Sequence, residues 1–173
     1  MGDLDQGIFE QIAHSPPSGR GGVWLQGALT LAFIPDQPLT LSFMLAEVDR
    51  QTVAELVSRL KQIPFEDRCT FEQAMWTFYC QEMSDGAGNF ETPQEQLDWE
   101  ADFDKHRTFP NPIHATTPEE VWPLVKFNRL IVTRWPSGSS AEAVLGGTAA
   151  WDGEHGITFR FNDRAELLAV DHW

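Results

Sequence analysis

Apolar and polar residues alternate near both ends of the chain, and this pattern predicts β-strands there. Residues 23–33 and 39–48 are the first two expected strands. Residues 34–38 contain two prolines, so we expect them to form a hairpin turn slightly looser than the two-residue type. Four later strands are expected to form an antiparallel meander over residues 128–135, 140–151, 156–162 and 165–173.

Between these strands the apolar residues recur every three or four positions, which predicts helices. The first helix follows the apolar residues from Val53 to Ile63 and is stopped by Pro64, with Thr52 and Glu55 in a capping-box pattern near its start. The second covers residues 66–83. Its apolar stripe is formed by Phe71, Ala74, Met75, Phe78 and Tyr79.

A third, short helix is expected to begin with Thr117 as its N-cap and Pro118 as its first residue, because Glu120 follows three positions after the cap. The resulting order is ββ-ααα-ββββ. We therefore expect an α+β fold, with a mainly antiparallel sheet and the helices packed on one face. With 173 residues, the chain has the usual length of a single domain, which we assign to residues 1–173.

The net charge of −14 is concentrated in the middle of the chain. Residues 65–120 contain 13 acidic and 3 basic residues, whereas residues 121–173 contain 6 acidic and 5 basic ones. This charge argues against nucleic-acid binding, because contact with phosphates requires a basic surface. An acidic surface keeps a protein soluble, and it can also attract a basic protein partner.

Residues from about 84 to 115 show no clean period, so we expect an acidic, irregular excursion across the surface. Its acidic residues would form the rim of an interface and its aromatic residues the anchors. The candidate partner-binding residues are Asp98, Trp99, Glu100, Asp102, Phe103 and Asp104.

Several classes of protein are disfavoured by the sequence. The N-terminus opens with acidic residues and no apolar run could span a bilayer, so we expect a cytoplasmic protein without membrane contact. Cys69 and Cys80 would lie about 16 Å apart along one helix, too far for a disulfide. No nucleophile motif or phosphate-binding loop is present, so we expect neither enzymatic activity nor a cofactor.

The segment Trp-Asp-Gly-Glu-His-Gly, residues 151–156, has two possible interpretations, a structural turn or a site with chemical function. Asp-Gly is a preferred hairpin dipeptide, so we expect a turn here between two strands. In this interpretation Trp151 packs at the end of the sheet, while Glu154 and His155 position the turn through hydrogen bonds. Asp152, Gly153 and Gly156 would supply the backbone conformations that the turn requires.

The alternative interpretation of this segment is a metal site. Asp152, Glu154 and His155 lie within four positions, although they lack the spacing that places ligands on one face. Asp171 or His172 from the neighbouring strand could add a further ligand. Such a site would indicate a small metal-assisted hydrolase.

Residues 116–173 carry a family resemblance. This region begins with a helix that opens Thr-Pro-Glu-Glu-Val-Trp at 117–122. Two strands, the motif Trp-Asp-x-Glu-His-Gly and the final strands follow. In this order of motifs, the region resembles a family of uncharacterised bacterial domains. Members of such families are suspected of being immunity proteins of polymorphic-toxin loci. The resemblance implies the fold and the hairpin motif, and it carries no catalytic assignment.

These observations favour a non-enzymatic cytoplasmic binding protein of the immunity type, which neutralises a basic toxin or effector through its acidic surface. The alternatives are the metal-assisted hydrolase and a structural or regulatory module that binds neither a toxin nor a metal.

Overall fold

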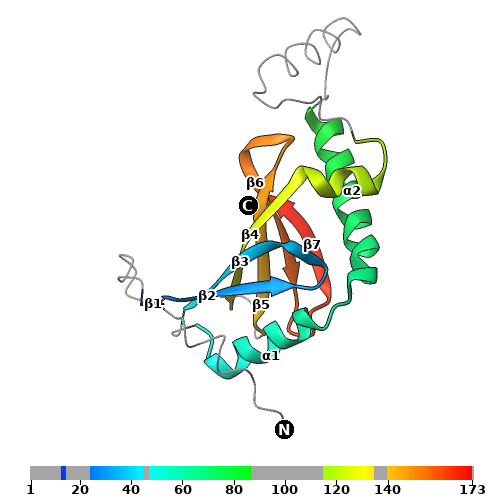
Figure 1. Ribbon diagram of the computed structural model, residues 1–173. Helices are drawn as coiled ribbons and strands as arrows, with labels where there is room; N and C mark the ends of the chain where they lie inside the picture. Colours follow the sequence, from blue (N-terminus) through cyan, green and yellow to red (C-terminus); the bar gives the residue numbers. More distant parts are fainter. Residues whose placement is uncertain (1–12, 15–23, 45–46, 87–114, 135–139, 173) are drawn as a thin grey trace, which may run out of the picture.

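The computed structural model describes residues 13–14, 24–44, 47–86, 115–134 and 140–172. Among these residues a single sheet contains seven strands, which follow one another in sequence order across it (Figure 1). The strands are β1 (Ala13–His14), β2 (Trp24–Leu31), β3 (Ile34–Met44), β4 (Val125–Thr133), β5 (Glu142–Ala149), β6 (Asp152–Phe161) and β7 (Leu167–His172).

Neighbouring strands are antiparallel except for β3 and β4, which are parallel. The helices that the structure describes lie between these two strands in the sequence, where the chain must return to the end of the sheet from which β4 starts. They are α1 (Arg50–Lys61), the 3-10 turn η2 (Phe65–Asp67), α2 (Arg68–Gly86), α4 (Pro118–Val121) and the 3-10 turn η3 (Trp122–Leu124). The expected mainly antiparallel α+β fold is therefore confirmed.

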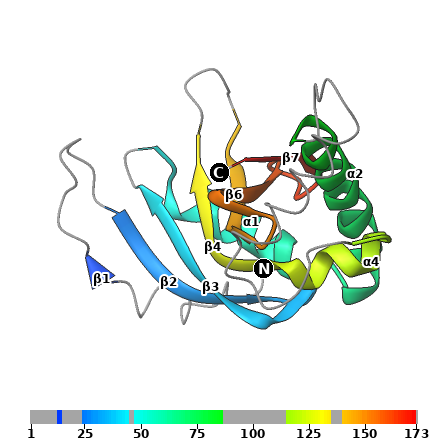
Figure 2. The same cartoon turned by 90° about the horizontal axis from the view of Figure 1, so that it is seen from above.

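The helices and one face of the sheet share a single core. Leu41 of β3, Leu130 of β4 and Phe159 of β6 are at most 1% exposed and belong to the same buried cluster as Leu56 of α1 and Met75 of α2. Figure 2 shows the strong curvature of the sheet, with α2 and α4 side by side near β7. This arrangement brings the end of β7 against α2, where the candidate site lies.

The first hairpin turns earlier than the prolines predicted. Leu31 pairs with Ile34, so the turn is the two-residue segment Ala32–Phe33, and residues 35–38 form a bulge within β3 before pairing resumes. Phe33 is fully buried, and its ring centroid lies 4.9 Å from that of Phe71 on α2. Burial of this aromatic ring explains the turn position better than the local turn propensity of the prolines does.

The start of α1 also differs from the expectation. Its N-cap is Asp49, whose carboxylate accepts hydrogen bonds from the backbone N–H of Thr52 at 2.9 Å and from its hydroxyl at 2.8 Å. The predicted Thr52–Glu55 capping box is therefore wrong, because Thr52 already lies in the first turn. Asp49 satisfies an N–H group that the helix leaves without a partner.

The remaining helices follow the sequence pattern more closely. Thr117 is the N-cap of α4 as expected, but Glu120 accepts from the backbone N–H of Thr116 at 2.7 Å. Cys69 and Cys80 are free and exposed on α2. In the described ranges, every helix is too short or too polar to cross a membrane.

Candidate functional site

The hairpin between β5 and β6 positions the first part of the site. Its turn is Ala150–Trp151, and β6 already begins at Asp152, so the expected turn at 152–155 is corrected by two residues. Ala149 pairs with Asp152 and Thr148 pairs with Gly156, which leaves residues 153–155 as a bulge at the start of β6.

Two contacts hold this bulged tip in place. The Asp152 carboxylate accepts a hydrogen bond from the backbone N–H of His155 at 2.9 Å, which closes the bulge. Trp151 is only 3% exposed, and its ring meets that of Tyr79 on α2 edge to face, with centroids 5.1 Å apart. The tip is therefore anchored to the helix layer as well as to the sheet.

The last strand supplies the second part of the site. His172 pairs with Ile157 across β6 and β7, which places both residues on the core side of the sheet, toward α2. The hydroxyl of Thr158 donates to the backbone oxygens of Asp171 and His172, at 3.2 and 3.4 Å. The His172 ring packs edge to face on Phe78 of α2, with centroids 5.2 Å apart.

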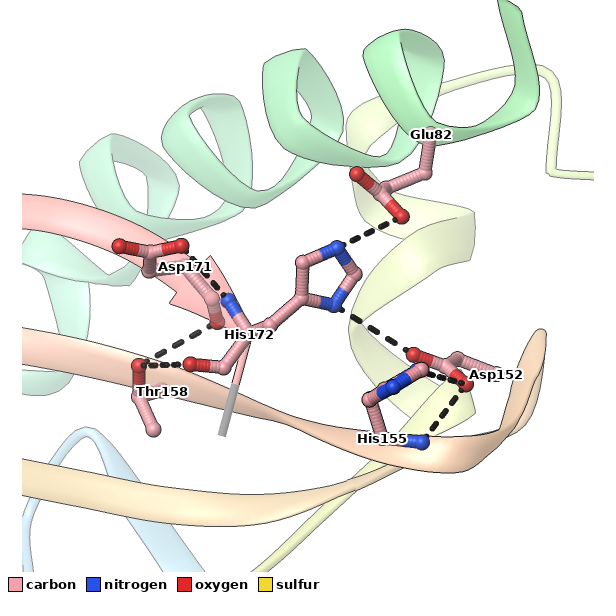
Figure 3. A network of polar contacts seen from close by, with 6 residues as sticks. All are labelled: Glu82, Asp152, His155, Thr158, Asp171 and His172. Carbon is pink, nitrogen blue, oxygen red and sulfur yellow. Dashed lines mark hydrogen bonds and ion pairs between the residues drawn. The ribbon is translucent and has the colours of Figure 1, made fainter. Parts of the chain in front are cut away.

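Four polar side chains meet where the hairpin tip, the end of β7 and α2 come together (Figure 3). His172 Nε2 lies 3.0 Å from Oε2 of Glu82, and His172 Nδ1 lies 3.5 Å from Oδ2 of Asp152. His155 Nδ1 lies 3.6 Å from the other Asp152 oxygen. We call Glu82, Asp152, His155 and His172 the α2–β6–β7 cluster.

The members of the cluster differ in their access to solvent. The exposed fraction of the side chain is 16% for Asp152 and 25% for Glu82, compared with 40% for His172 and 59% for His155. The two carboxylates are thus less exposed than the two imidazoles. One atom each from Asp152, His155 and His172 lies within 4.8 Å of the other two, a separation from which they could hold a metal ion.

The structure selects among the residues that the sequence suggested. Asp152, His155 and His172 come together, whereas Asp171 points its carboxylate at the backbone N–H of His172, 2.9 Å away. The side chain of Glu154 lies outside the described part of the chain. The six candidate partner-binding residues also lie outside it, within residues 87–114.

Glu82 was missed by the sequence analysis. It lies on α2, 90 positions before His172, and it belongs to no recognisable motif. Its role depends on the packing of α2 against β7, which no local pattern reports. The only usable signal is its polarity near the end of an apolar helix stripe.

A hollow lies along strands β4 to β7. It has a volume of about 390 Å³ and is lined by Ile131, Thr133, Val144, Thr158, Arg160, Asp171 and His172. Arg160 is held by Glu142 across β5 and β6, with Nη2 at 2.8 Å from the carboxylate. The hollow therefore contains a charged side chain that already has a partner.

Comparison with known proteins shows the family. Residues 9–173 match the model of DUF6985, described as a domain of unknown function, and the chain belongs to this family. The match includes all the described residues, with the α2–β6–β7 cluster among them. No curated protein and no solved structure matches the chain.

Proposed function

We propose that this DUF6985 protein is a non-enzymatic, immunity-type binding protein that neutralises a basic toxin or effector. The observation that carries the proposal is the concentration of negative charge in residues 65–120, which contain 13 acidic and 3 basic residues. Residues Asp98, Glu100, Asp102 and Asp104 would form the charged rim of the interface, with Trp99 and Phe103 as its anchors.

The described residues support one location for this charge. The acidic stretch leaves the end of α2 and returns before α4, and these two helices lie side by side. At the returning end, the backbone N–H of Ala115 donates to the hydroxyl oxygen of Tyr79 on α2, at 3.3 Å. Both ends of the stretch are thereby attached to the same helix layer.

The helix layer adds negative charge of its own. Glu66, Asp67, Glu119 and Glu120 are exposed at the starts of η2 and α4. Arg68, the one basic residue of residues 65–120 that the structure describes, binds Glu72 through Nε at 2.8 Å. Its guanidinium also lies over the Trp122 ring, 5.3 Å from the centroid. The local field is therefore negative, and it would accelerate the approach of a basic protein.

The test measures association with the purified product of the gene adjacent to the one that encodes this chain. In the test variant, Asp98→Asn, Glu100→Gln, Asp102→Asn and Asp104→Asn remove four charges from the excursion. We expect association at low ionic strength to slow by about tenfold and its salt dependence to become flatter, because steering acts on the on-rate. Stopped-flow fluorescence at several salt concentrations measures both.

A charge-matched control separates a local interface from a general effect of net charge. Its substitutions are Asp36→Asn, Glu47→Gln, Glu55→Gln and Asp163→Asn, all at exposed residues outside 65–120. We expect this control to associate nearly as fast as the parent. Absence of binding by the parent, or equal on-rates for the parent and the test variant, would show that the proposal is wrong.

A further inference from the structure

We propose that Asp152, His155 and His172 bind one divalent transition-metal ion of the zinc class, and that Glu82 orients His172 for this task. The site is independent of the acidic excursion. It is built entirely from described residues of α2, β6 and β7 (Figure 3).

The separations suit a small ion. A tetrahedral zinc ion with bonds of about 2.0–2.1 Å keeps its ligand atoms about 3.4 Å apart. One Asp152 oxygen lies 3.6 Å from His155 Nδ1, and the other lies 3.5 Å from His172 Nδ1. One ligand atom from each of the three residues lies within 4.8 Å of the other two. The rings of the two histidines have centroids 5.4 Å apart, so binding of one ion requires the exposed His155 ring to move toward His172.

The types of ligand select the metal. Imidazole nitrogens suit zinc, copper, nickel and iron, whereas magnesium and calcium prefer sites made of oxygen atoms only. Two imidazoles with one carboxylate match the three-ligand sets of zinc sites that leave a fourth position for water. The exposure of His155, at 59%, leaves that fourth position open to solvent.

Glu82 supplies the outer partner that metal-binding histidines usually have. When Nδ1 of a histidine binds a metal, its Nε2–H donates to a carboxylate, a carbonyl or water, which fixes the tautomer and the ring orientation. His172 has this geometry, with Nδ1 toward Asp152 and Nε2 at 3.0 Å from Glu82. The edge-to-face contact with Phe78 holds the ring from the side.

A charged imidazolium between two carboxylates would produce the same distances without a metal. The two arrangements differ in what they predict for added zinc. If the cluster is only an ion pair, added Zn²⁺ does not bind to it. A metal site binds one Zn²⁺ ion per chain. It also requires His155, whereas an ion pair between His172 and its two carboxylates does not.

The experiment uses the full chain after removal of metals with a chelator. Titration calorimetry with Zn²⁺ alone is expected to show saturable binding of one ion per chain. In nitrogen-detected NMR spectra of the histidine rings, zinc should shift the signals of His155 and His172 among the five histidines. This measurement uses only the parent chain, so it decides the question even where a variant fails to fold.

Variants establish which residues bind. His155→Ala is expected to abolish saturable binding while the chain stays folded, because the bulge is closed by the backbone N–H of His155 and not by its ring. His172→Ala should also abolish it. Glu82→Gln should weaken the zinc affinity by about 10- to 100-fold without abolishing binding, as expected for a residue that acts through a ligand.

The matched control is His14→Ala, which removes an imidazole from β1 at the opposite edge of the sheet. It should bind zinc like the parent. The proposal is overturned if the parent shows no saturable zinc binding, or if His155→Ala and His172→Ala bind as the parent does. Either result leaves the proposed interaction with a basic protein untouched, because that interaction is measured without zinc.

Discussion

Asp49 and Asp152 close two different local structures in the same way. Each carboxylate accepts a hydrogen bond at 2.9 Å from the backbone N–H three residues later, in one case at the start of α1 and in the other at the bulge of β6. The hydrogen bonds from the backbone and side chain of Thr52 lower the pKa of Asp49 below its ordinary value of 3.8. At Glu120, hydrogen bonds from Thr116 lower the pKa in the same manner.

The pKa of Asp49 leads to a prediction on stability and pH. Because the folded state lowers this pKa, the ionised carboxylate stabilises the fold above the unfolded-state pKa, and the effect is lost as pH falls through the folded-state pKa. Asp49→Asn should therefore lower the free energy of unfolding at pH 7. We expect the difference from the parent to shrink progressively as the pH is lowered through and below 3.8.

Urea denaturation at several pH values measures this difference. Asp36→Asn removes another exposed carboxylate, from β3, and serves as the reference for losing one surface charge. A difference between Asp49→Asn and the parent that stays constant from pH 7 to the acidic limit of folding would contradict the assignment.

At the scale of elements, the β5–β6 hairpin and α2 depend on each other. The hairpin tip is tied to η3 by the hydrogen bond from the Ala150 N–H to the Leu124 oxygen, at 2.8 Å. Trp151 extends from the same tip into the contact with Tyr79 of α2. Because Asp152 follows directly, the packing of Trp151 also sets the position of one carboxylate of the α2–β6–β7 cluster.

Trp151→Ala should consequently be among the most damaging single changes in the molecule. Truncating a buried tryptophan removes its apolar contacts and leaves a cavity, at a cost of about 3–5 kcal/mol. Leu168→Ala is the control, because Leu168 on β7 is 51% exposed, and it should change stability by no more than about 0.5 kcal/mol. Chemical denaturation measures both. Equal stability of the two variants would mean that the hairpin tip does not depend on this anchor.

At the scale of the whole molecule, the parallel pairing of β3 with β4 joins two halves of the sequence. Thr40 to Phe43 pair with Arg129 to Val132, across a stretch that contains every helix of the described residues. The first hairpin and the final four-stranded meander therefore become one sheet, and both contribute to the same core as α1 and α2. None of these parts has a separate core of its own among the described residues.

This shared core predicts a single cooperative unfolding transition. Far-ultraviolet circular dichroism reports the helices and strands, while tryptophan fluorescence reports sites such as Trp122 and Trp151, which are 6% and 3% exposed. Both signals should give the same midpoint in urea, because the elements lose their common core together. Midpoints that differ clearly between the two probes would indicate that the hairpin or the helix layer unfolds as a separate unit.

The sequence by itself determined the types and order of the elements from β2 onward, whereas the two-residue strand β1 was not expected. The change from alternating to three-to-four periodicity distinguishes the strands from α1 and α2, and it does so because burial of one face repeats along each element. The close spacing of Asp152, Glu154 and His155 also suggested possible ligands, with Asp171 or His172 as an addition. The expected positions of the β2–β3 and β5–β6 turns were wrong, however, because local turn propensity does not show where Phe33 and Trp151 are buried.

Only the tertiary structure decided the positions of those turns, the parallel β3–β4 pair and the composition of the cluster. Glu82, Asp152 and His172 belong to three elements separated along the chain, and they meet because α2 packs against β7 while the strand register places His172 opposite Ile157. Periodicity shows which face of an element is buried. The composition of a site also depends on which other element packs against that face. That information lies in long-range contacts, which a local pattern does not contain.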